Sequence, residues 1–202
     1  MNSLYKLGIT LFFLSTTASA QTFTQPGTVE LGGDISFSSQ TSPSQTNGGS
    51  TTILSFGPYV GFMLSSGFEL GLMPGISYMN ESTFSGTQLN LFIAPSYNFG
   101  SGESTHPYLE FLLGYNSVSY QYKFLYSNSF GLEAGGLGIG FDAGMKFNLQ
   151  GNSLMLFKIQ YLHQSFVDSR VVQSGINAEQ ILNTLSFGMG FRVFLEGKVG
   201  KK

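Results

Sequence analysis

Apolar and polar residues alternate with a period of two along residues 50–79. In STTILSFGPYVGFML the face of Leu54 and Phe56 is apolar, whereas the face of Gly57 consists mostly of glycine and small residues. FELGLMPGISYM repeats this pattern after the break at Ser65–Gly67. Sustained alternation predicts β-strands rather than a helix. Because glycine in the break suits a tight turn, the stretch predicts a hairpin.

The same alternation recurs in six further segments, so the chain carries eight predicted strands. The hairpin supplies the second and third. The other predicted strands are Thr28–Ser38, Thr87–Phe99, Pro107–Ser119, Gly135–Asn148, Ser153–Phe166 and Ile181–Leu195. We expect polar, mostly long connections after the odd-numbered strands and short turns after the second and sixth, although GSGESTH after the fourth is longer than this pattern. Long loops on one rim and short turns on the other are typical of outer-membrane barrels.

The two faces of the predicted strands differ in a way that favours a membrane barrel. A face of glycine and small polar residues cannot fill a soluble core, but it can line a narrow barrel whose apolar face meets lipid. Charged residues make up only 10% of the chain, whereas a soluble surface needs roughly 25–35%. Beyond the N-terminus no apolar run approaches the roughly 18 residues of a membrane helix. The predicted fold is an all-β, eight-stranded, antiparallel, up-and-down transmembrane β-barrel.

Three prolines stand at similar places inside predicted strands, at Pro58, Pro74 and Pro95. Proline has no N–H for the ladder of hydrogen bonds between strands. We therefore expect bulges or weakly paired positions there.

Residues 1–20 have the features of a secretory signal peptide. Lys6 supplies the positive charge, LGITLFFL the short apolar core, and Ala18–Ala20 an A-x-A cleavage site. The alternative is an uncleaved membrane anchor, for which the apolar core is short. We expect cleavage after Ala20, leaving one barrel domain over residues 21–202.

Composition argues against several kinds of site. The chain has no cysteine, which excludes disulfides, thiolate nucleophiles and Cys-ligated metals. Its net charge of −2 gives no electrostatic case for nucleic acid. GLEAGGLGIGFDAG is not a phosphate loop, because Ala143 replaces the third glycine and no helix follows. Gly136, Gly140 and Gly144 instead share an inward face. We expect no catalytic, cofactor or metal site.

The two histidines are the candidate residues for an enzymatic site. His106 lies in a predicted turn, and His163 has Ser165, Asp168 and Ser169 nearby in the sequence. A few outer-membrane barrels are enzymes, with a histidine and a nucleophile or acid at the outer rim. We favour the alternative that His163 belongs to the polar belt of the rim.

Several segments resemble a known family. SFGPYVGFMLSSGFELGLMPGISY, LNLFIAPSYNF and PYLEFLLGYN resemble the outer membrane protein β-barrel domain family of small eight-stranded Gram-negative barrels. The matched strand motif comprises Pro107, Tyr108, Glu110, Gly114 and Tyr115. SFGMGFRV resembles the terminal signal read by barrel-assembly machinery, although LEGKVGKK follows it here. The resemblance implies a place in the cell outer membrane, with membrane lipid and that machinery as partners.

The segment YQYKFLYSNSF, Tyr120–Phe130, is aromatic for a loop. It is either a contact surface for lipid headgroups or a surface protein, or an aromatic girdle on strands that extend beyond the membrane. Both alternatives stay open.

Eight charged residues fall on the inward face, mostly in the half of the barrel near both chain ends, whereas the other half shows mainly glycine, serine and asparagine. Charges removed from water are tolerated when paired. Closure places the last strand beside the first, so Arg192 should meet Glu30, and Lys158 should likewise meet Asp142. We expect a salt-bridge plug, the alternative being a wet lumen with solvated charges. The predicted cluster is Glu30, Asp34, Glu69, Glu110, Asp142, Lys146, Lys158 and Arg192.

An eight-stranded barrel has an interior that side chains can fill. The favoured function is therefore a non-enzymatic outer-membrane protein with a structural or surface-contact role and a closed lumen. The alternative is a narrow channel or conduit for small or apolar solutes, and a rim-site enzyme is third.

Mass spectrometry of the exported protein tests the signal peptide. We expect the first residue to be Gln21, because Ala18–Ala20 presents the small residues that signal peptidase requires. A mature protein that retains Lys6 would contradict export by cleavage.

Overall fold

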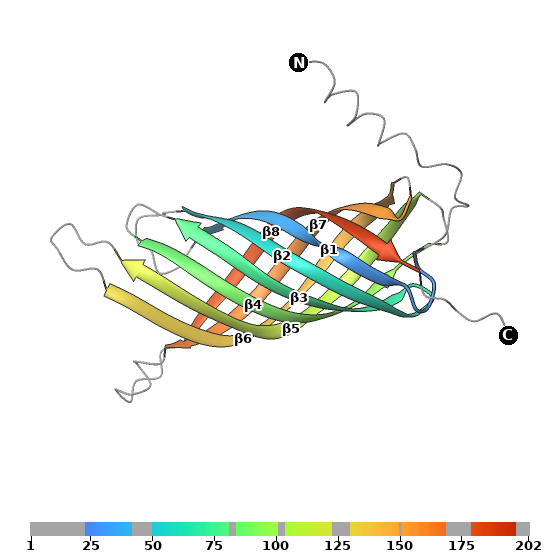
Figure 1. The fold of residues 1–202 in the computed structure, drawn as a ribbon. Coiled ribbons are helices and arrows are strands. Elements are labelled where there is room, and N and C mark those ends of the chain that lie inside the picture. The colour runs from blue at the N-terminus through green and yellow to red at the C-terminus, as the bar shows by residue number, and fades with distance from the viewer. Residues whose placement is uncertain are drawn as a thin grey trace, which may run out of the picture.

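The computed structural model describes residues 23–41, 50–80, 84–100, 104–122, 130–149, 151–168 and 179–196. These residues form a closed barrel of eight strands (Figure 1). Each strand pairs antiparallel with the next, and β1 pairs with β8 to close the sheet. The predicted fold class is confirmed. The strands are β1 (Val29–Thr41), β2 (Ser50–Ser65), β3 (Phe68–Asn80), β4 (Phe84–Asn98), β5 (Thr105–Tyr122), β6 (Phe130–Asn148), β7 (Ser153–Asp168) and β8 (Glu179–Leu195).

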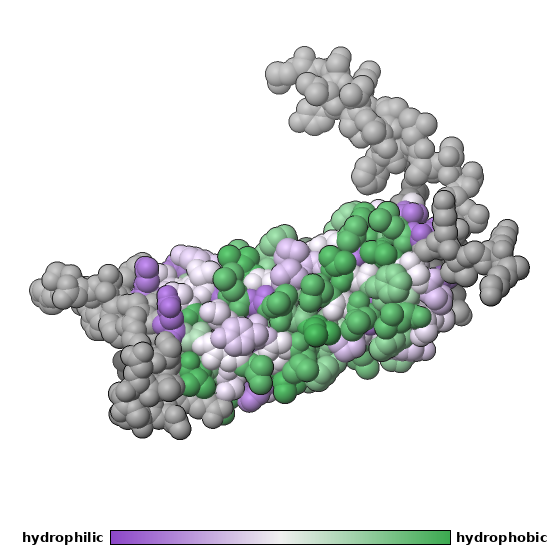
Figure 2. Space-filling view, turned by 60° about the horizontal axis from the view of Figure 1, so that its bottom comes forward, coloured by the Kyte–Doolittle hydropathy of each residue, from purple (hydrophilic) through white to green (hydrophobic). Residues whose placement is uncertain are grey.

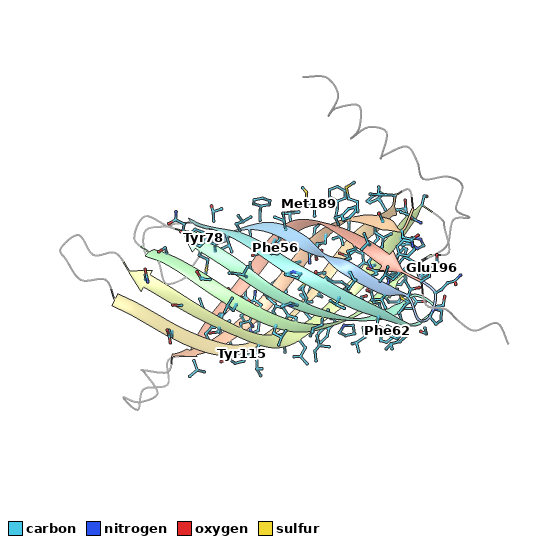
Figure 3. All side chains as sticks on the ribbon, in the orientation of Figure 1. Phe56, Phe62, Tyr78, Tyr115, Met189 and Glu196 are labelled. Atoms are coloured by element: carbon cyan, nitrogen blue, oxygen red, sulfur yellow. The ribbon has the colours of Figure 1, made fainter. Side chains whose placement is uncertain are left out.

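The outer surface of the barrel is apolar. Exposed and buried side chains alternate along β3 almost without interruption, as the period of two predicts. The outward residues include Phe62, Tyr115 and Met189, which project from the barrel in Figure 3. Hydrophobic residues cover much of the face shown in Figure 2. An apolar surface this continuous is unsuited to water and suited to lipid. Within the described ranges, no helix has the length and apolarity needed to cross a membrane.

The strands extend beyond their predicted ends at the rim opposite the chain termini. β5 runs to Tyr122 and β6 begins at Phe130, so the ends of the aromatic segment are strand, while residues 123–129 lie outside the described residues. β3 ends at Asn80 and β4 begins at Phe84, which corrects the prediction of a long connection there. Polar residues beyond the apolar band still pair with neighbouring strands, so alternating hydrophobicity does not mark these strand ends.

The two rims differ as expected. The start of β1 and the end of β8 lie at the right end of the barrel in Figure 1, together with the turn between β2 and β3. In that turn Gly67 has a φ of 79°, a conformation that glycine adopts without strain. The predicted signal peptide, residues 1–20, lies outside the described residues.

Pro58 on β2 and Pro74 on β3 lie in a gap in the pairing of these two strands. Pairing of β2 with β3 has a gap between Phe56↔Ile76 and Val60↔Leu72, apart from a shift of register between Met63 and Ser65 near the turn. In this register Pro58 lies opposite Pro74, so neither residue can donate a backbone hydrogen bond. Pairing of β4 with β5 is likewise absent at Pro95, within the described parts of those strands. The prolines therefore mark weakly paired positions, as expected.

Arginine substitutions at two depths test whether the apolar face meets lipid. Ile139, midway along β6, is 47% exposed, and Leu149, just beyond its end, is 40% exposed. Ile139→Arg should lower the free energy of unfolding from lipid vesicles by about 2–4 kcal/mol, because the charge enters hydrocarbon. Leu149→Arg should cost about 0–1 kcal/mol at the interface. Denaturant titration of both variants gives the comparison, and equal small effects would show that this face does not meet lipid.

Candidate functional site

The eight predicted inward charges lie inside the barrel and are nearly inaccessible, with at most 6% of each residue exposed. They come from six strands that surround the lumen, so the fold gathers them from distant parts of the sequence. Among the described residues, seven of the eight take part in ion pairs, and Glu110 does not. The eight are Glu30, Asp34, Glu69, Glu110, Asp142, Lys146, Lys158 and Arg192.

Two cations bind Glu30 on β1. Lys146 Nζ lies 2.9 Å from Glu30 Oε1 and 2.9 Å from Glu69 Oε2. Arg192 Nη1 lies 3.3 Å from Glu30 Oε2, and its Nη2 lies 3.3 Å from Asp34 Oδ2. The Arg192–Glu30 contact, which strand closure led us to expect, is thus part of a larger network. Lys146 joins β6 to β1 and β3 across the lumen.

Lys158 continues this network toward the middle of the barrel. Its Nζ lies 2.8 Å from Asp34 Oδ2 and 2.7 Å from Asp142 Oδ2. The Lys158–Asp142 contact is the second pair expected from strand adjacency. The ion pairs form one chain in which the sign of the charge alternates at every step. In order, this charged chain is Glu69, Lys146, Glu30, Arg192, Asp34, Lys158 and Asp142.

Neutral side chains complete both ends of the charged chain. The Tyr59 hydroxyl donates to Glu69 Oε1 at 2.9 Å, and Ser96 Oγ donates to Glu69 Oε2 at 3.3 Å. At the other end Gln160 Nε2 donates to Asp142 Oδ2 at 3.2 Å. A buried carboxylate needs such donors in addition to its ion pair. The sequence placed Tyr59 on the inward face, but alternation alone does not reveal its hydrogen bond.

Glycines make room for these large side chains. The Arg192 guanidinium lies 3.5 Å from the centre of the Tyr59 ring, as in a cation–π contact. A Cβ atom at Gly71 would overlap the Tyr59 ring, and one at Gly61 would overlap the Glu69 carboxylate. The glycines of the inward face therefore provide the space in which the charged chain packs.

Apolar layers flank the charged chain on both sides, and Asp34 and Lys158 also border a polar cavity. The layer nearer the chain termini consists of Phe23, Met63, Leu154 and Phe194. The layer nearer the middle of the barrel consists of Tyr59, Met73, Phe92, Ala94, Leu112 and Leu162. Charges between two apolar layers interact in a low dielectric, where pairing is strong and an unpaired charge is costly.

The segment before β1 helps to cover the terminal end of the lumen, which sequence reasoning missed. Thr24 O accepts a hydrogen bond from Gly67 N at 3.1 Å, and Gly27 N donates to Met63 O at 2.8 Å. Phe23 is thereby fully buried, with its ring centre 4.7 Å from that of His106. His106 was expected in a turn but lies in β5 and is buried. The segment has no periodicity from which its packing could be predicted.

The half of the lumen toward the opposite rim is partly polar. A cavity of about 60 Å³ is lined by hydroxyl and amide side chains, including Ser36, Gln88 and Asn90, with Asp34 and Lys158 also on its wall. It has room for several water molecules. The expectation of mainly glycine, serine and asparagine is incomplete, because an apolar cluster also lies near this rim. That cluster comprises Ile53, Met79, Val118, Ala134 and Phe166.

His163 lies on the outer face of β7 and is exposed. Its Nδ1 lies 2.7 Å from Asn183 Oδ1, which also accepts a hydrogen bond from the Tyr161 hydroxyl at 3.0 Å. The Asp168 side chain and Ser169 lie outside what the structure describes. In the described ranges no three His, Asp or Glu side chains are arranged to hold a metal ion.

Comparisons with known proteins identify the fold. No family model and no curated protein matches the sequence. Neisserial surface protein A is similar in structure, with 14% identity, coverage of 82% of this chain and 95% of that protein, and a TM-score of 0.59. OprG of Pseudomonas aeruginosa has 14% identity, coverage of 86% and 98%, and a TM-score of 0.54. The outer membrane protein AlkL has 10% identity, coverage of 93% and 99%, and a TM-score of 0.53. The chain therefore has the fold of the small eight-stranded outer-membrane β-barrels.

Proposed function

We propose that this chain is an integral outer-membrane protein, a closed β-barrel without enzymatic activity that serves envelope structure or surface contact. Its continuous apolar outer face and its fold, shared with outer-membrane proteins, support this location. The cell's barrel-assembly machinery would insert it, and residues 1–20 would direct its export.

The charged chain of alternating sign is the main observation that supports a closed lumen. It links side chains of β1, β3, β6, β7 and β8 across the interior, and its charged residues are at most 6% exposed. Fully paired charges bring opposite walls together, whereas solvated charges would leave a wet path. The Phe23 layer adds a second barrier at the end of the lumen where the chain termini lie. This closure would leave the barrel without a route for diffusion.

The surface-contact role rests on the rim opposite the termini. We place the termini in the periplasm, as short turns at that rim are typical of outer-membrane barrels. The connections at residues 42–49, 123–129 and 169–178 would then face the exterior. They are the proposed contacts with lipid headgroups or a surface protein.

One observation favours a second candidate function, a conduit for small or apolar solutes. The polar cavity is lined by Phe56 and Ile76, although both side chains are about half exposed on the outer face. These residues pair at the edge of the β2–β3 gap, next to Gly57 and Gly75. The cavity therefore approaches the outer surface where β2 and β3 are not paired and where Gly57 and Gly75 have no side chains.

Removing Arg192 tests the closed lumen. Arg192→Ala leaves Glu30 and Asp34 with one cation each, and breaking a buried pair costs about 3–5 kcal/mol. We expect a loss of that order in the free energy of unfolding, or steady single-channel steps in planar bilayers where the wild type gives none.

Glu30→Ala should behave like Arg192→Ala, because Glu30 contacts both Lys146 and Arg192. Glu196→Gln is the matched control, since it removes an exposed charge just beyond β8 and should change stability by less than about 0.5 kcal/mol. If both lumen variants match the control in stability and conductance, the charged chain does not close the barrel.

Adding side chains at the β2–β3 gap tests the conduit. An added Cβ at Gly57 or Gly75 would meet its nearest neighbours at 3.5 Å and 3.6 Å, so Gly57→Ala and Gly75→Ala fit without overlap. If the conduit exists, both variants should slow transfer of an apolar dye into proteoliposomes while the barrel stays folded. Thr184→Val, which keeps the shape of the cavity wall on β8, is the control. A wild type that transfers no dye beyond empty liposomes rules the conduit out.

A further inference from the structure

Glu110 is the one predicted lumen charge that the charged chain leaves out. It lies on β5, is 2% exposed, and neither of its carboxylate oxygens has a hydrogen-bond partner in the described part of the molecule. An ionised carboxylate in such a place bears the full cost of desolvation. The ion pairs of the charged chain therefore do not explain how the carboxyl group of Glu110 is tolerated inside the barrel.

The nearest strands place another acid against Glu110. Asp142 is its cross-strand partner on β6, and Ser96 is its partner on β4. Directly opposite residues have Cβ atoms roughly 4.5–5.5 Å apart, so the two carboxyl groups share one site. Charged or titratable groups that act on Glu110 also come from other strands and from β5 itself. They are Asp142, Glu69, Lys158, Arg192, Tyr59 and Tyr108.

The two cations in that set are already engaged. Lys158 lies between Asp34 and Asp142, and Arg192 lies between Glu30 and Asp34. The charged chain has four acids and three bases, so it carries a net charge of −1 when every group is ionised. Ionising Glu110 would change the net charge of these buried groups from −1 to −2, with no further cation to balance it. Two neighbouring carboxylates in a site that excludes water relieve this repulsion by taking up a proton.

Nothing in the described residues points to a metal ion beside Glu110. The lumen cavity is lined by Asp34 and Lys158 but not by Glu110 or Asp142. The described residues hold no group of three acidic or histidine side chains suited to a metal ion. Asp142 Oδ1 also has no hydrogen-bond partner among the described residues, so it can accept a hydrogen bond from a protonated Glu110.

We propose that Glu110 is a proton-binding site of the folded barrel, a neutral carboxylic acid that donates to Asp142, and that its ionisation makes the closed lumen sensitive to pH. The folded protein then binds one proton more than the unfolded chain at neutral pH. Stability should fall as the pH rises above the range in which an ordinary glutamate ionises, because the native state must give up that proton. The proton site stands on the geometry of Glu110 alone, and only its effect on conductance rests on the proposed closed lumen.

Infrared spectroscopy of the refolded full-length chain detects the proton directly. We expect the carbonyl band of a protonated carboxylic acid at neutral pH, lost in Glu110→Gln and retained in Glu196→Gln, which removes an exposed carboxylate instead. Glu110→Gln should be at least as stable as the wild type and should lose most of the decline in stability with rising pH. The proposal is overturned if the wild type lacks the band, or if Glu110→Gln keeps the full pH dependence.

A second variant keeps the test usable if Glu110→Gln fails to fold. In Asp142→Asn the neighbouring carboxylate is gone, so Glu110 can ionise without a second negative charge, and the band should weaken or vanish. A band unchanged in Asp142→Asn would contradict a proton held by this pair. Conductance that rises at high pH in the wild type but not in Glu110→Gln would tie the proton to the plug. If infrared spectroscopy finds the proton but Arg192→Ala changes neither stability nor conductance, the closed lumen is contradicted and the proton site at Glu110 still stands.

Discussion

The cost of holding charges away from water organises the interior of this barrel. Eight ionisable side chains are buried in the lumen, and seven of them are held there by ion pairs. Lys146 meets acids on β1 and β3, and Arg192 meets two acids on β1. The Lys146 contacts join strands that the backbone ladder connects only around the circumference, whereas Arg192 reinforces the paired strands β8 and β1. The ion pairs thus add internal cross-links to a closed sheet.

Other features of the inward face follow from this constraint. Large charged and aromatic side chains fit only where their neighbours have no Cβ, as at Gly61 and Gly71. The apolar layers around Phe23 and Leu112 strengthen the ion pairs by keeping water away. The glycine content that first suggested a barrel lumen therefore has a specific cause. Glycine is needed where the charged chain needs space.

Alternation along the sequence predicts which face of a strand a residue takes, but it cannot predict the packing of segments outside the strands. All eight charges that alternation assigns to the inward face are buried in the structure, because parity along each strand fixes which face a residue takes. Alternation could not predict Phe23, since the preceding segment is held by backbone hydrogen bonds to Met63 and Gly67 rather than by a periodic face. The apolar cluster near the opposite rim could have been predicted, because the alternation along β2 and β3 puts Ile53 and Met79 on the inward face.

The two candidate functions require different environments for one side chain. A closed barrel keeps the site of Glu110 and Asp142 dry, and a dry site favours a shared proton over two adjacent negative charges. A conduit needs water in the lumen, and hydrated carboxylates can both ionise, since water screens their repulsion. The β2–β3 gap adjoins the cavity rather than Glu110, so a conduit there must also keep its water from reaching the charged chain. The protonation state of Glu110 is therefore a measure of how far water enters the barrel.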